Sequence, residues 1–102
     1  MRPDLESLMT LDRLVHEPAR LVILTVLAEA EEVEFRFLES VSGLTKGNLS
    51  GHIAKLEDAG YVEVRKFFRG KIPATSVKIT RSGRSALKTY RQQLNHGLQR
   101  KP

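Results

Sequence analysis

The sequence contains no cysteine, and its longest apolar run is short. Without cysteine the chain has no disulfide, no thiolate metal site and no thiol nucleophile. The longest run, residues 21–28, is 8 residues broken by Thr25, far below the roughly 20 that a membrane-spanning helix requires. The first six residues also lack the apolar stretch of a signal peptide. We therefore expect a cytoplasmic protein that does not contact a membrane.

The composition is otherwise that of an ordinary globular protein. The chain has 102 residues, of which 40% are hydrophobic and 28% are charged. This length is typical of one domain, and this balance argues against a disordered chain. We expect residues 1–102 to form a single domain.

Positive charge is scarce in the first part of the chain and abundant in the second. Residues 1–44 hold 4 Lys and Arg against 9 Asp and Glu, whereas residues 45–102 hold 13 against 3. The net charge thus changes from −5 to +10 within one small domain. Such a step indicates a surface that binds anions, and nucleic acid is the leading candidate. A basic surface that is merely solvated remains the alternative.

Two helices are predicted before residue 31. Leucine and methionine recur at spacings of three and four over residues 4–14, and Asp4 is a plausible N-cap. The second helix begins at Pro18, which suits a first helical position because it lacks an N–H. Its residues 21–28 are apolar almost all round, so this helix belongs at the centre of the core.

The middle of the chain alternates short elements with tight turns. Acidic and apolar residues alternate over residues 31–35, which favours a short edge strand. A helix of about two turns should follow and end at Gly43. Thr45 is a good N-cap for a helix over residues 46–59, with Gly60 as its stop.

The hydrophobic period changes after Gly60. Two alternating segments, residues 61–68 and 75–79, flank turn signals and predict a β-hairpin with a basic tip. Thr80 can cap a last helix over residues 81–98. The expected order is α-α-β-α-α-β-β-α, a mainly α fold with a small β-hairpin (α+β). This order is that of a winged helix-turn-helix.

In a helix-turn-helix the second helix reaches base edges in the major groove of DNA. Within residues 46–59, Leu49, Ile53 and Leu56 share the predicted buried face. The first half of the outer face is small, hydrogen-bonding and free of acid, which suits contact with bases and phosphates. The predicted DNA-binding residues of this helix are Thr45, Lys46, Gly47, Asn48, Ser50, Gly51 and Lys55.

Two features of this helix have alternative interpretations. Gly47 and Gly51 would let the helix approach the groove floor, at a cost of roughly 1 kcal/mol each in helix stability. Close packing against another helix is the other explanation. For His52, beside the apolar stripe, a hydrogen bond to backbone is expected rather than a base contact. The three histidines are isolated in the sequence, so we expect no metal site and no cofactor.

The hairpin supplies a second predicted DNA-binding surface, the wing, over residues 65–75. Its basic side chains can lie along the phosphate backbone or enter a narrow minor groove. The alternative is a solvated hairpin whose charge prevents aggregation through its edge. The predicted contacts of the wing are Arg65, Lys66, Arg69, Gly70 and Lys71.

The terminal helices, over about residues 4–15 and 81–98, predict dimerisation. The last helix would be about 27 Å long at 1.5 Å per residue, so its end should extend past the core. A homodimer would place two recognition helices about one DNA turn apart and bind a pseudo-palindromic operator. Packing of both helices within one chain is the alternative. The predicted interface consists of Leu5, Leu8, Met9, Leu87, Tyr90, Leu94 and Leu98.

Residues 44–62 resemble the recognition helix and following strand of small winged-helix regulators related to MarR and ArsR. Residues 68–75 and 79–87 are similar to the wing and last helix of the same family, and the resemblance covers about residues 11–90. It implies a homodimeric transcription factor of prokaryotic type that binds specific sequences in double-stranded DNA. It also implies dimerisation through the terminal helices.

The sequence departs from that family in two respects. Gly51 stands where MarR-like proteins often have a larger polar or basic residue, so the contacts with bases can differ. The cysteine and histidine clusters with which many ArsR-like repressors sense metals are missing, so metal sensing is not implied. MarR-like relatives often bind a small apolar effector, but no residue here marks such a pocket.

Two other classes of function are weighed against a DNA-binding regulator. A protein-interaction module would use the Leu/Met face of the first helix or the acidic residues 29–39. An enzyme would need a nucleophile–base pair, a metal cluster or a phosphate-binding glycine loop, and the sequence offers none of these. We expect a regulator and no enzymatic activity.

Overall fold

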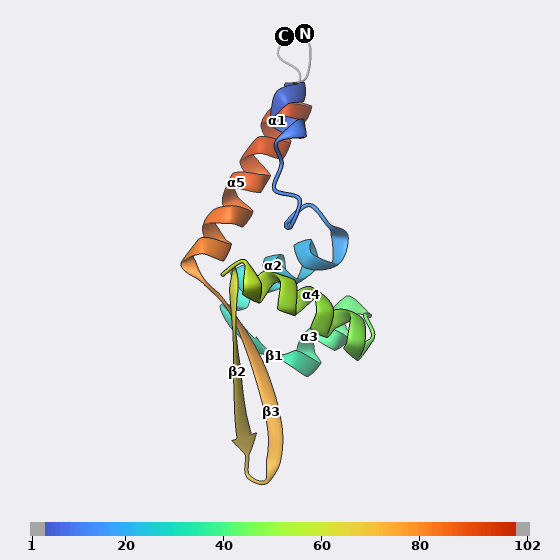
Figure 1. Cartoon of the computed structure of the whole chain (residues 1–102), viewed down its shortest axis with the longest axis vertical. Helices are drawn as coiled ribbons and strands as arrows, with labels where there is room; N and C mark the ends of the chain where they lie inside the picture. The colour runs from blue at the N-terminus through green and yellow to red at the C-terminus, as the bar shows by residue number, and fades with distance from the viewer. Residues whose placement is uncertain (1–3, 100–102) are drawn as a thin grey trace.

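The computed structural model describes residues 4–99 and confirms the predicted order of elements (Figure 1). Helices α2, α3 and α4 pack around one end of a sheet of three strands, and α5 extends from that end to α1. The elements are α1 (Leu5–Met9), α2 (Pro18–Ala30), β1 (Glu32–Glu34), α3 (Phe35–Ser42), α4 (Lys46–Asp58), β2 (Val62–Arg69), β3 (Ile72–Ile79) and α5 (Arg81–Leu98).

The first helix is shorter than the sequence predicts. Asp4 caps α1 as expected by accepting a hydrogen bond from the Ser7 N–H at 3.2 Å, but the helix ends at Met9. A turn follows, in which the Asp12 carboxylate accepts hydrogen bonds from the N–H groups of Leu14 and Val15. The prediction of a helix over residues 4–15 is therefore wrong in its second half. The Asp12 carboxylate, and not the backbone carbonyl groups of a helix, accepts the hydrogen bonds from these N–H groups.

Helix α2 forms the centre of the core, as its apolar composition predicts. Pro18 occupies its first turn, and the Glu17 side chain caps it by accepting a hydrogen bond from the Arg20 N–H at 2.9 Å. Ile23, Leu24 and Leu27 are fully buried. The other buried hydrophobic residues are Val15, Leu38, Leu49, Ile53, Leu56, Val62, Val77, Ile79, Leu87 and Tyr90.

The sheet has the strand order β1-β3-β2, and both pairings are antiparallel. Strand β1 is therefore an edge strand, as predicted. Neighbours along a strand point to opposite faces, whereas residues paired across strands point to the same face. One face carries Val62 and Val64 opposite Ile79 and Val77 and meets the core. The other face carries charged side chains and faces away from the core.

A tight turn joins α3 to α4 and sets the direction of α4. Gly43 ends α3 with φ +69, a left-handed conformation that glycine adopts without steric cost. Thr45 then caps α4 by accepting a hydrogen bond from the Asn48 N–H at 3.2 Å. Both sequence predictions for this turn are confirmed.

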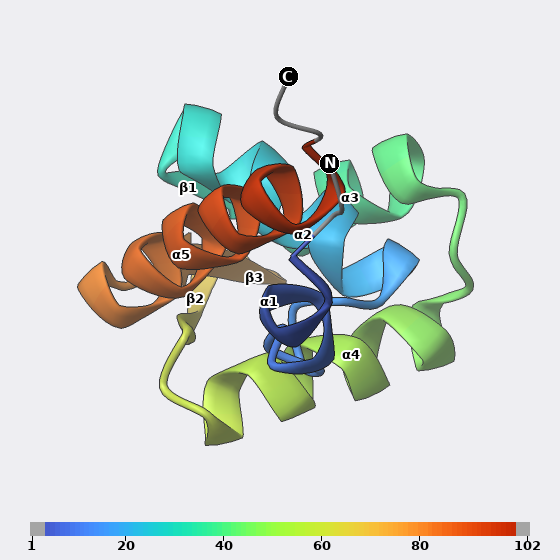
Figure 2. The same ribbon diagram turned by 90° about the horizontal axis from the view of Figure 1, so that it is seen from above.

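The molecule is elongated, with extents of 60 × 25 × 21 Å. The β2–β3 hairpin extends from one end of the helical body, and α1 lies against the end of α5 at the other (Figure 1). Viewed down the long axis, α4 runs along one side of the body and α5 along the opposite side (Figure 2). We call α1 and the second half of α5 the arm.

Candidate nucleic-acid interface

Helix α4 presents the face that the sequence assigns to DNA. Leu49, Ile53 and Leu56 are buried against the core, which turns the opposite side of the helix outward. That outer side has no acidic residue in its first turn and exposes several backbone N–H groups at its start. All seven predicted residues are exposed, namely Thr45, Lys46, Gly47, Asn48, Ser50, Gly51 and Lys55.

The two glycines of α4 border open space. A methyl group added at Gly47 or Gly51 would meet no atom within 4 Å outside the helix's own backbone and the adjacent residues. Close packing against another helix of the same chain therefore does not explain them. Both positions lie on a strip of the outer face that has no side chains. A ligand surface such as the floor of a DNA groove can come close to the helix backbone there.

His52 joins α4 to α2 through side chains rather than to backbone as expected. Its Nδ1 lies 3.1 Å from Nη1 of Arg20, and its Nε2 lies 3.6 Å from a carboxylate oxygen of Glu17. Arg20 is itself buried and donates from Nε to the Leu14 carbonyl at 2.6 Å. Burial of Glu17 opposes ionisation, but the Arg20 N–H and the nearby His52 outweigh it and lower the pKa of the carboxyl group. This cluster fixes α4 against the start of α2.

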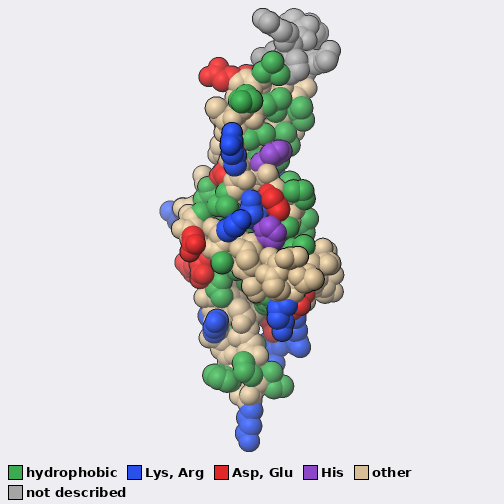
Figure 3. Space-filling view, turned by 45° about the vertical axis from the view of Figure 1, so that its right-hand side comes forward, with side chains coloured by type: hydrophobic (Ala, Val, Ile, Leu, Met, Phe, Trp, Pro, Cys, Tyr) green, Lys and Arg blue, Asp and Glu red, His purple; other side chains and the backbone are tan. Residues whose placement is uncertain are grey.

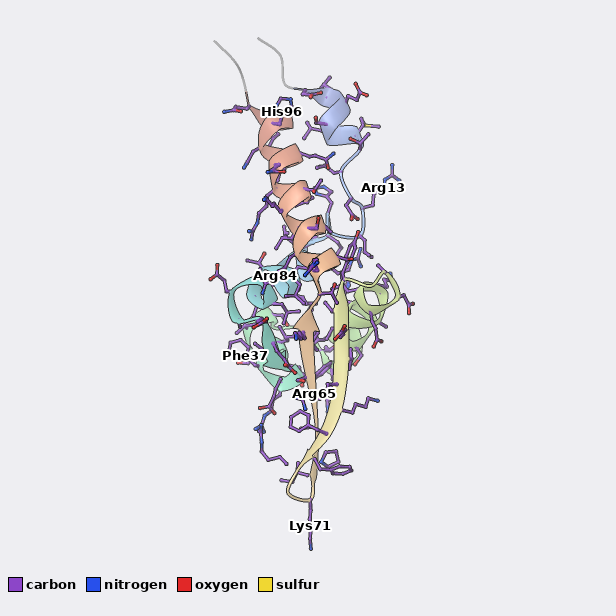
Figure 4. The ribbon with its side chains drawn as sticks, turned by 90° about the vertical axis from the view of Figure 1, so that its left-hand side faces the viewer. Arg13, Phe37, Arg65, Lys71, Arg84 and His96 are labelled. Atoms are coloured by element: carbon purple, nitrogen blue, oxygen red, sulfur yellow. The ribbon has the colours of Figure 1, made fainter. Side chains whose placement is uncertain are left out.

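The hairpin of β2 and β3 forms the predicted wing. Its turn is only two residues long, and Gly70 adopts φ +65 there. Lys71 projects from the tip, beyond the ends of both strands (Figure 4). A blue side chain marks the same end of the molecule in the space-filling view (Figure 3).

A groove of about 400 Å³ separates α4 from the wing. Lys46, Ser50 and, nearer the end of the helix, Glu57 line it from α4, and Lys66 and Thr75 line it from the hairpin. The first turn of α4 and one cation of the wing thus border the same space. An anionic strand in this groove would meet lysines from both sides.

Two predicted contacts of the wing lie on the other face and are paired with acids of β1. Arg69 donates from both terminal nitrogens to the two carboxylate oxygens of Glu34, at 3.1 and 2.9 Å. Arg65 contacts a single oxygen of Glu32 with Nε and Nη2, each at 3.3 Å. The hydrogen bond from Ser76, and then Arg65, lower the pKa of Glu32, while Arg69 lowers the pKa of Glu34. Sequence reasoning missed these pairs because β1 is far from β2 in the chain.

The two phenylalanines of the wing point to opposite faces, as strand alternation requires. The Phe67 ring is half-buried beneath Arg65, whose guanidinium carbon lies 4.6 Å from the ring centroid. Phe68 is 71% exposed on the face that carries Lys66. Phe67 therefore supports the wing, and Phe68 adds an apolar side chain to its open surface.

The arm carries exposed apolar side chains. Leu5, Met9 and Leu98 are 63%, 75% and 59% exposed. Hydrophobic side chains gather at this end of the molecule in Figure 3. The Asp4 carboxylate lies 3.0 Å from Nε2 of His96 and holds the start of α1 to α5. Hydrogen bonds from Ser7, and then His96, lower the pKa of Asp4.

The structure corrects the predicted interface at two positions. Leu87 and Tyr90 are 2% and 3% exposed and belong to the core of a single chain. Tyr90 also contacts Nδ1 of His16 through its hydroxyl at 2.8 Å. Burial within the chain leaves no surface of these two residues for a second subunit, whereas Leu8 and Leu94 are half-buried.

Two structural residues escaped the sequence analysis. A methyl group at Gly83 would overlap the Tyr61 carbonyl oxygen, so α5 begins in direct contact with the end of the α4–β2 turn. The Tyr61 hydroxyl donates to the Asp12 carboxylate at 2.6 Å, and this bond, together with burial, raises the pKa of Tyr61 to about 12. A glycine within a predicted helix was the one available signal, since helix propensity alone disfavours it there.

Residues 4–99 contain neither a candidate metal site nor a membrane-spanning helix. This part of the chain has no group of three or more His, Asp or Glu side chains placed to hold a metal ion. None of its helices is long and apolar enough to cross a membrane.

A helix-turn-helix with a basic wing, exposed on one side and packed on a single core, defines a winged helix protein. The sequence profile of the winged helix DNA-binding domain matches residues 19–98. An uncharacterised protein of Methanocaldococcus jannaschii is 39% identical over 79 residues, which are 76% of this chain and 85% of that protein. The chain belongs to the winged helix DNA-binding family.

Solved structures of regulators share this fold. A transcriptional regulator homologue of Pyrococcus horikoshii matches with a TM-score of 0.82 and 32% identity, over 90% of each chain. A variant of Escherichia coli MarR complexed with operator DNA matches with a TM-score of 0.63 and 21% identity, over 87% of this chain and 69% of that one. The protein is accordingly a DNA-binding transcriptional regulator and not an enzyme, and its fold is that of MarR regulators.

Proposed function

We propose that this regulator binds specific sites in double-stranded DNA as a homodimer, with α4 in the major groove and the wing against the adjacent backbone or minor groove. Asn48 and Ser50 would contact base edges, and Lys46 and Lys55 would neutralise phosphates. Thr45, Gly47 and Gly51 would complete the contact by allowing close approach.

One observation carries the proposal: the outer face of α4 is both bare and free of acid in its first turn. Gly47 and Gly51 open onto empty space, and the groove beside them has a lysine on each side. Glycine at these exposed helical positions lowers the stability of the helix. Close contact with a DNA duplex would explain why glycine, and not a residue with higher helix propensity, occupies these two positions.

The arm supplies the reason to propose a homodimer. Leu5, Met9 and Leu98 together expose an apolar surface at the end of the molecule opposite the wing. A second copy that packs its own arm there would bury this surface on both chains through a symmetric contact. The operator would then be a pseudo-palindrome whose half-sites lie about one DNA turn apart.

The experiment is a titration of DNA duplexes followed by fluorescence anisotropy at several salt concentrations, with the mass of the protein measured by light scattering. An operator is first selected from a random library, and Asn48→Ala and Lys55→Ala are then compared on it and on a random duplex. Asn48→Ala should lose affinity for the operator only, by a factor of about 5 to 100. Lys55→Ala should weaken both duplexes and reduce the salt dependence by about one unit.

The competing function is a protein-interaction module, and the same measurements separate the two. No binding to any duplex at low salt would contradict the proposal, and the basic face would then require an acidic protein partner. Equal losses on operator and random DNA in Asn48→Ala would remove α4 from base recognition. A monomeric mass at the concentrations that bind DNA would contradict the homodimer.

A further inference from the structure

We infer that Glu32 and Glu34 of β1 hold Arg65 and Arg69 away from DNA, so that the wing binds the duplex through Lys66 and Lys71. The inference rests on the proposed function and specifies which side chains of the wing carry it. It gives the acidic edge strand a role in DNA binding, that of setting how many wing cations a duplex can reach.

The first argument is the orientation of the side chains on the sheet. Lys66 shares its face with Val64 and its cross-strand partner Thr75, and these residues line the groove beside α4. Arg65 and Arg69 belong to the opposite face by strand alternation. In Figure 4, α4 lies on one side of the hairpin and Phe37 of α3 on the other. Arg65 therefore points away from the side on which α4 would meet DNA. Arg69 also borders a second pocket together with Lys46, and there its guanidinium is paired with Glu34.

The second argument is the geometry of the ion pairs. The two parallel hydrogen bonds from Arg69 to Glu34, at 3.1 and 2.9 Å, form the bidentate contact that is strongest between arginine and a carboxylate. A phosphate that approached the two terminal nitrogens of this guanidinium would compete with the Glu34 carboxylate for the same donors. Arg36 adds a second cation 3.9 Å from the same carboxylate.

The third argument is that Arg65 is held from two sides. The Glu32 carboxylate accepts a hydrogen bond from Nε of Arg65 and forms an ion pair with its Nη2, and it also accepts a hydrogen bond from the buried hydroxyl of Ser76. The Phe67 ring lies beneath Arg65 at 4.6 Å and is also within 5.8 Å of the Arg69 guanidinium. Cations over an aromatic face gain further stabilisation. The Arg65 guanidinium is thus held by Glu32 of β1 and Phe67 of β2, and Ser76 of β3 orients Glu32.

Lys71 differs from these arginines in its surroundings. It is exposed at the turn and projects beyond the strands (Figure 4). Lys66 is also exposed and faces the groove. A flexible ammonium group at such a place can follow a phosphate without breaking an existing bidentate contact.

The test counts phosphate contacts from the salt dependence of binding to a random duplex. Each neutralised phosphate contributes about 0.9 to the slope of log K against log salt. Lys71→Ala should reduce the slope by about 0.9, whereas Arg69→Ala should leave it unchanged. Glu34→Gln should release Arg69 and make the slope steeper by about 0.9. If wild type and variant bind equally at 1 M salt, this slope gives the variant a roughly eightfold higher affinity at 0.1 M salt.

Two further variants separate this effect from a change in overall charge. Glu63→Gln removes one negative charge from an exposed position on the same face but frees no arginine of the tip, and it should change the slope little. The double variant Glu34→Gln/Arg69→Ala should return to the slope of the wild type. Thermal unfolding of each variant verifies that the comparison is made between folded proteins.

The outcomes distinguish this inference from the function on which it rests. If the wild type binds DNA and Arg69→Ala lowers its slope by about one unit, the inference is overturned and the proposed function stands. An equal gain of affinity in Glu63→Gln and Glu34→Gln would also overturn it. If the wild type binds no duplex at low salt, the proposed function fails and the inference fails with it.

Discussion

Gly97 of α5 lies directly against the Leu8 side chain of α1. A methyl group at position 97 would come within 2.6 Å of two Leu8 carbon atoms, well inside van der Waals contact. The short helix α1 can rest on the last turn of α5 because this position has no side chain. The arm therefore depends on a single glycine at the point where its two helices are closest.

We expect Gly97→Ala to loosen α1 without unfolding the domain. The added methyl group pushes Leu8 away, at a cost of about 1–3 kcal/mol that the better helix propensity of alanine offsets only in part. Hydrogen exchange should become faster at the amides of residues 7–10. The double variant Gly97→Ala/Leu8→Ala relieves the overlap, so failure to slow the exchange again would contradict this explanation.

Gly83→Ala should destabilise the whole domain instead. Its methyl group would overlap the Tyr61 carbonyl oxygen, and that oxygen accepts the backbone hydrogen bond from Thr80 at 3.0 Å. Backbone cannot move aside as a flexible side chain can, so we expect a loss of about 2–4 kcal/mol in the free energy of unfolding. Denaturation by urea measures it. A loss under about 0.5 kcal/mol would show that the start of α5 can shift freely.

Gly51→Ala is the matched control for Gly83→Ala, because it should raise the free energy of unfolding where Gly83→Ala lowers it. This position borders open space, and alanine in an exposed helix stabilises by about 0.5–1 kcal/mol relative to glycine. The same variant should bind the selected operator more weakly, since the methyl group occupies the bare strip of α4. An unchanged operator affinity would separate Gly51 from DNA contact.

Tyr61→Phe tests the bond between the α4–β2 turn and the loop before α2. Loss of the hydrogen bond to Asp12 should cost about 1–2 kcal/mol at neutral pH. Since the pKa of Tyr61 is raised to about 12 from its usual value of 10.0, this stabilisation is fully present below pH 10 and is lost as the pH rises through 12. The difference in unfolding free energy between wild type and Tyr61→Phe should therefore shrink over that interval.

Ultraviolet absorbance of the phenolate gives an independent measurement of the same contact. Asp12→Asn removes the carboxylate that favours the protonated phenol, so the pKa of Tyr61 should fall towards 10. If the phenolate of Asp12→Asn titrates with the same midpoint as that of the wild type, burial alone raises the pKa of Tyr61.

Local patterns were sufficient to predict the order of the elements, because caps, glycine stops and hydrophobic periods act over a few residues. Thr45, Gly43 and Thr80 each end or begin a helix where the sequence predicts it. The prediction for the first helix failed at Asp12, whose carboxylate bonds backbone N–H groups that a helix would otherwise use. Apolar spacing alone does not reveal such competition.

The charge pattern predicted where DNA would bind but not which cations are available. Arg65 and Arg69 stand beside Lys66 and Lys71 in the sequence and share their charge. Only the pairing of β1 with β3 shows that Glu32 and Glu34 lie next to the arginines. Likewise, the spacing of Leu87 and Tyr90 could not distinguish a surface between two chains from the core of one.

The 60 Å length of the molecule limits the stretch of operator that it can cover. With the arm at one end and Lys71 at the other, two chains joined through their arms reach at most about 120 Å from tip to tip. Duplex DNA rises about 3.4 Å per base pair, so such a pair protects no more than about 35 base pairs from nuclease digestion. A longer protected footprint would require additional copies side by side on the operator.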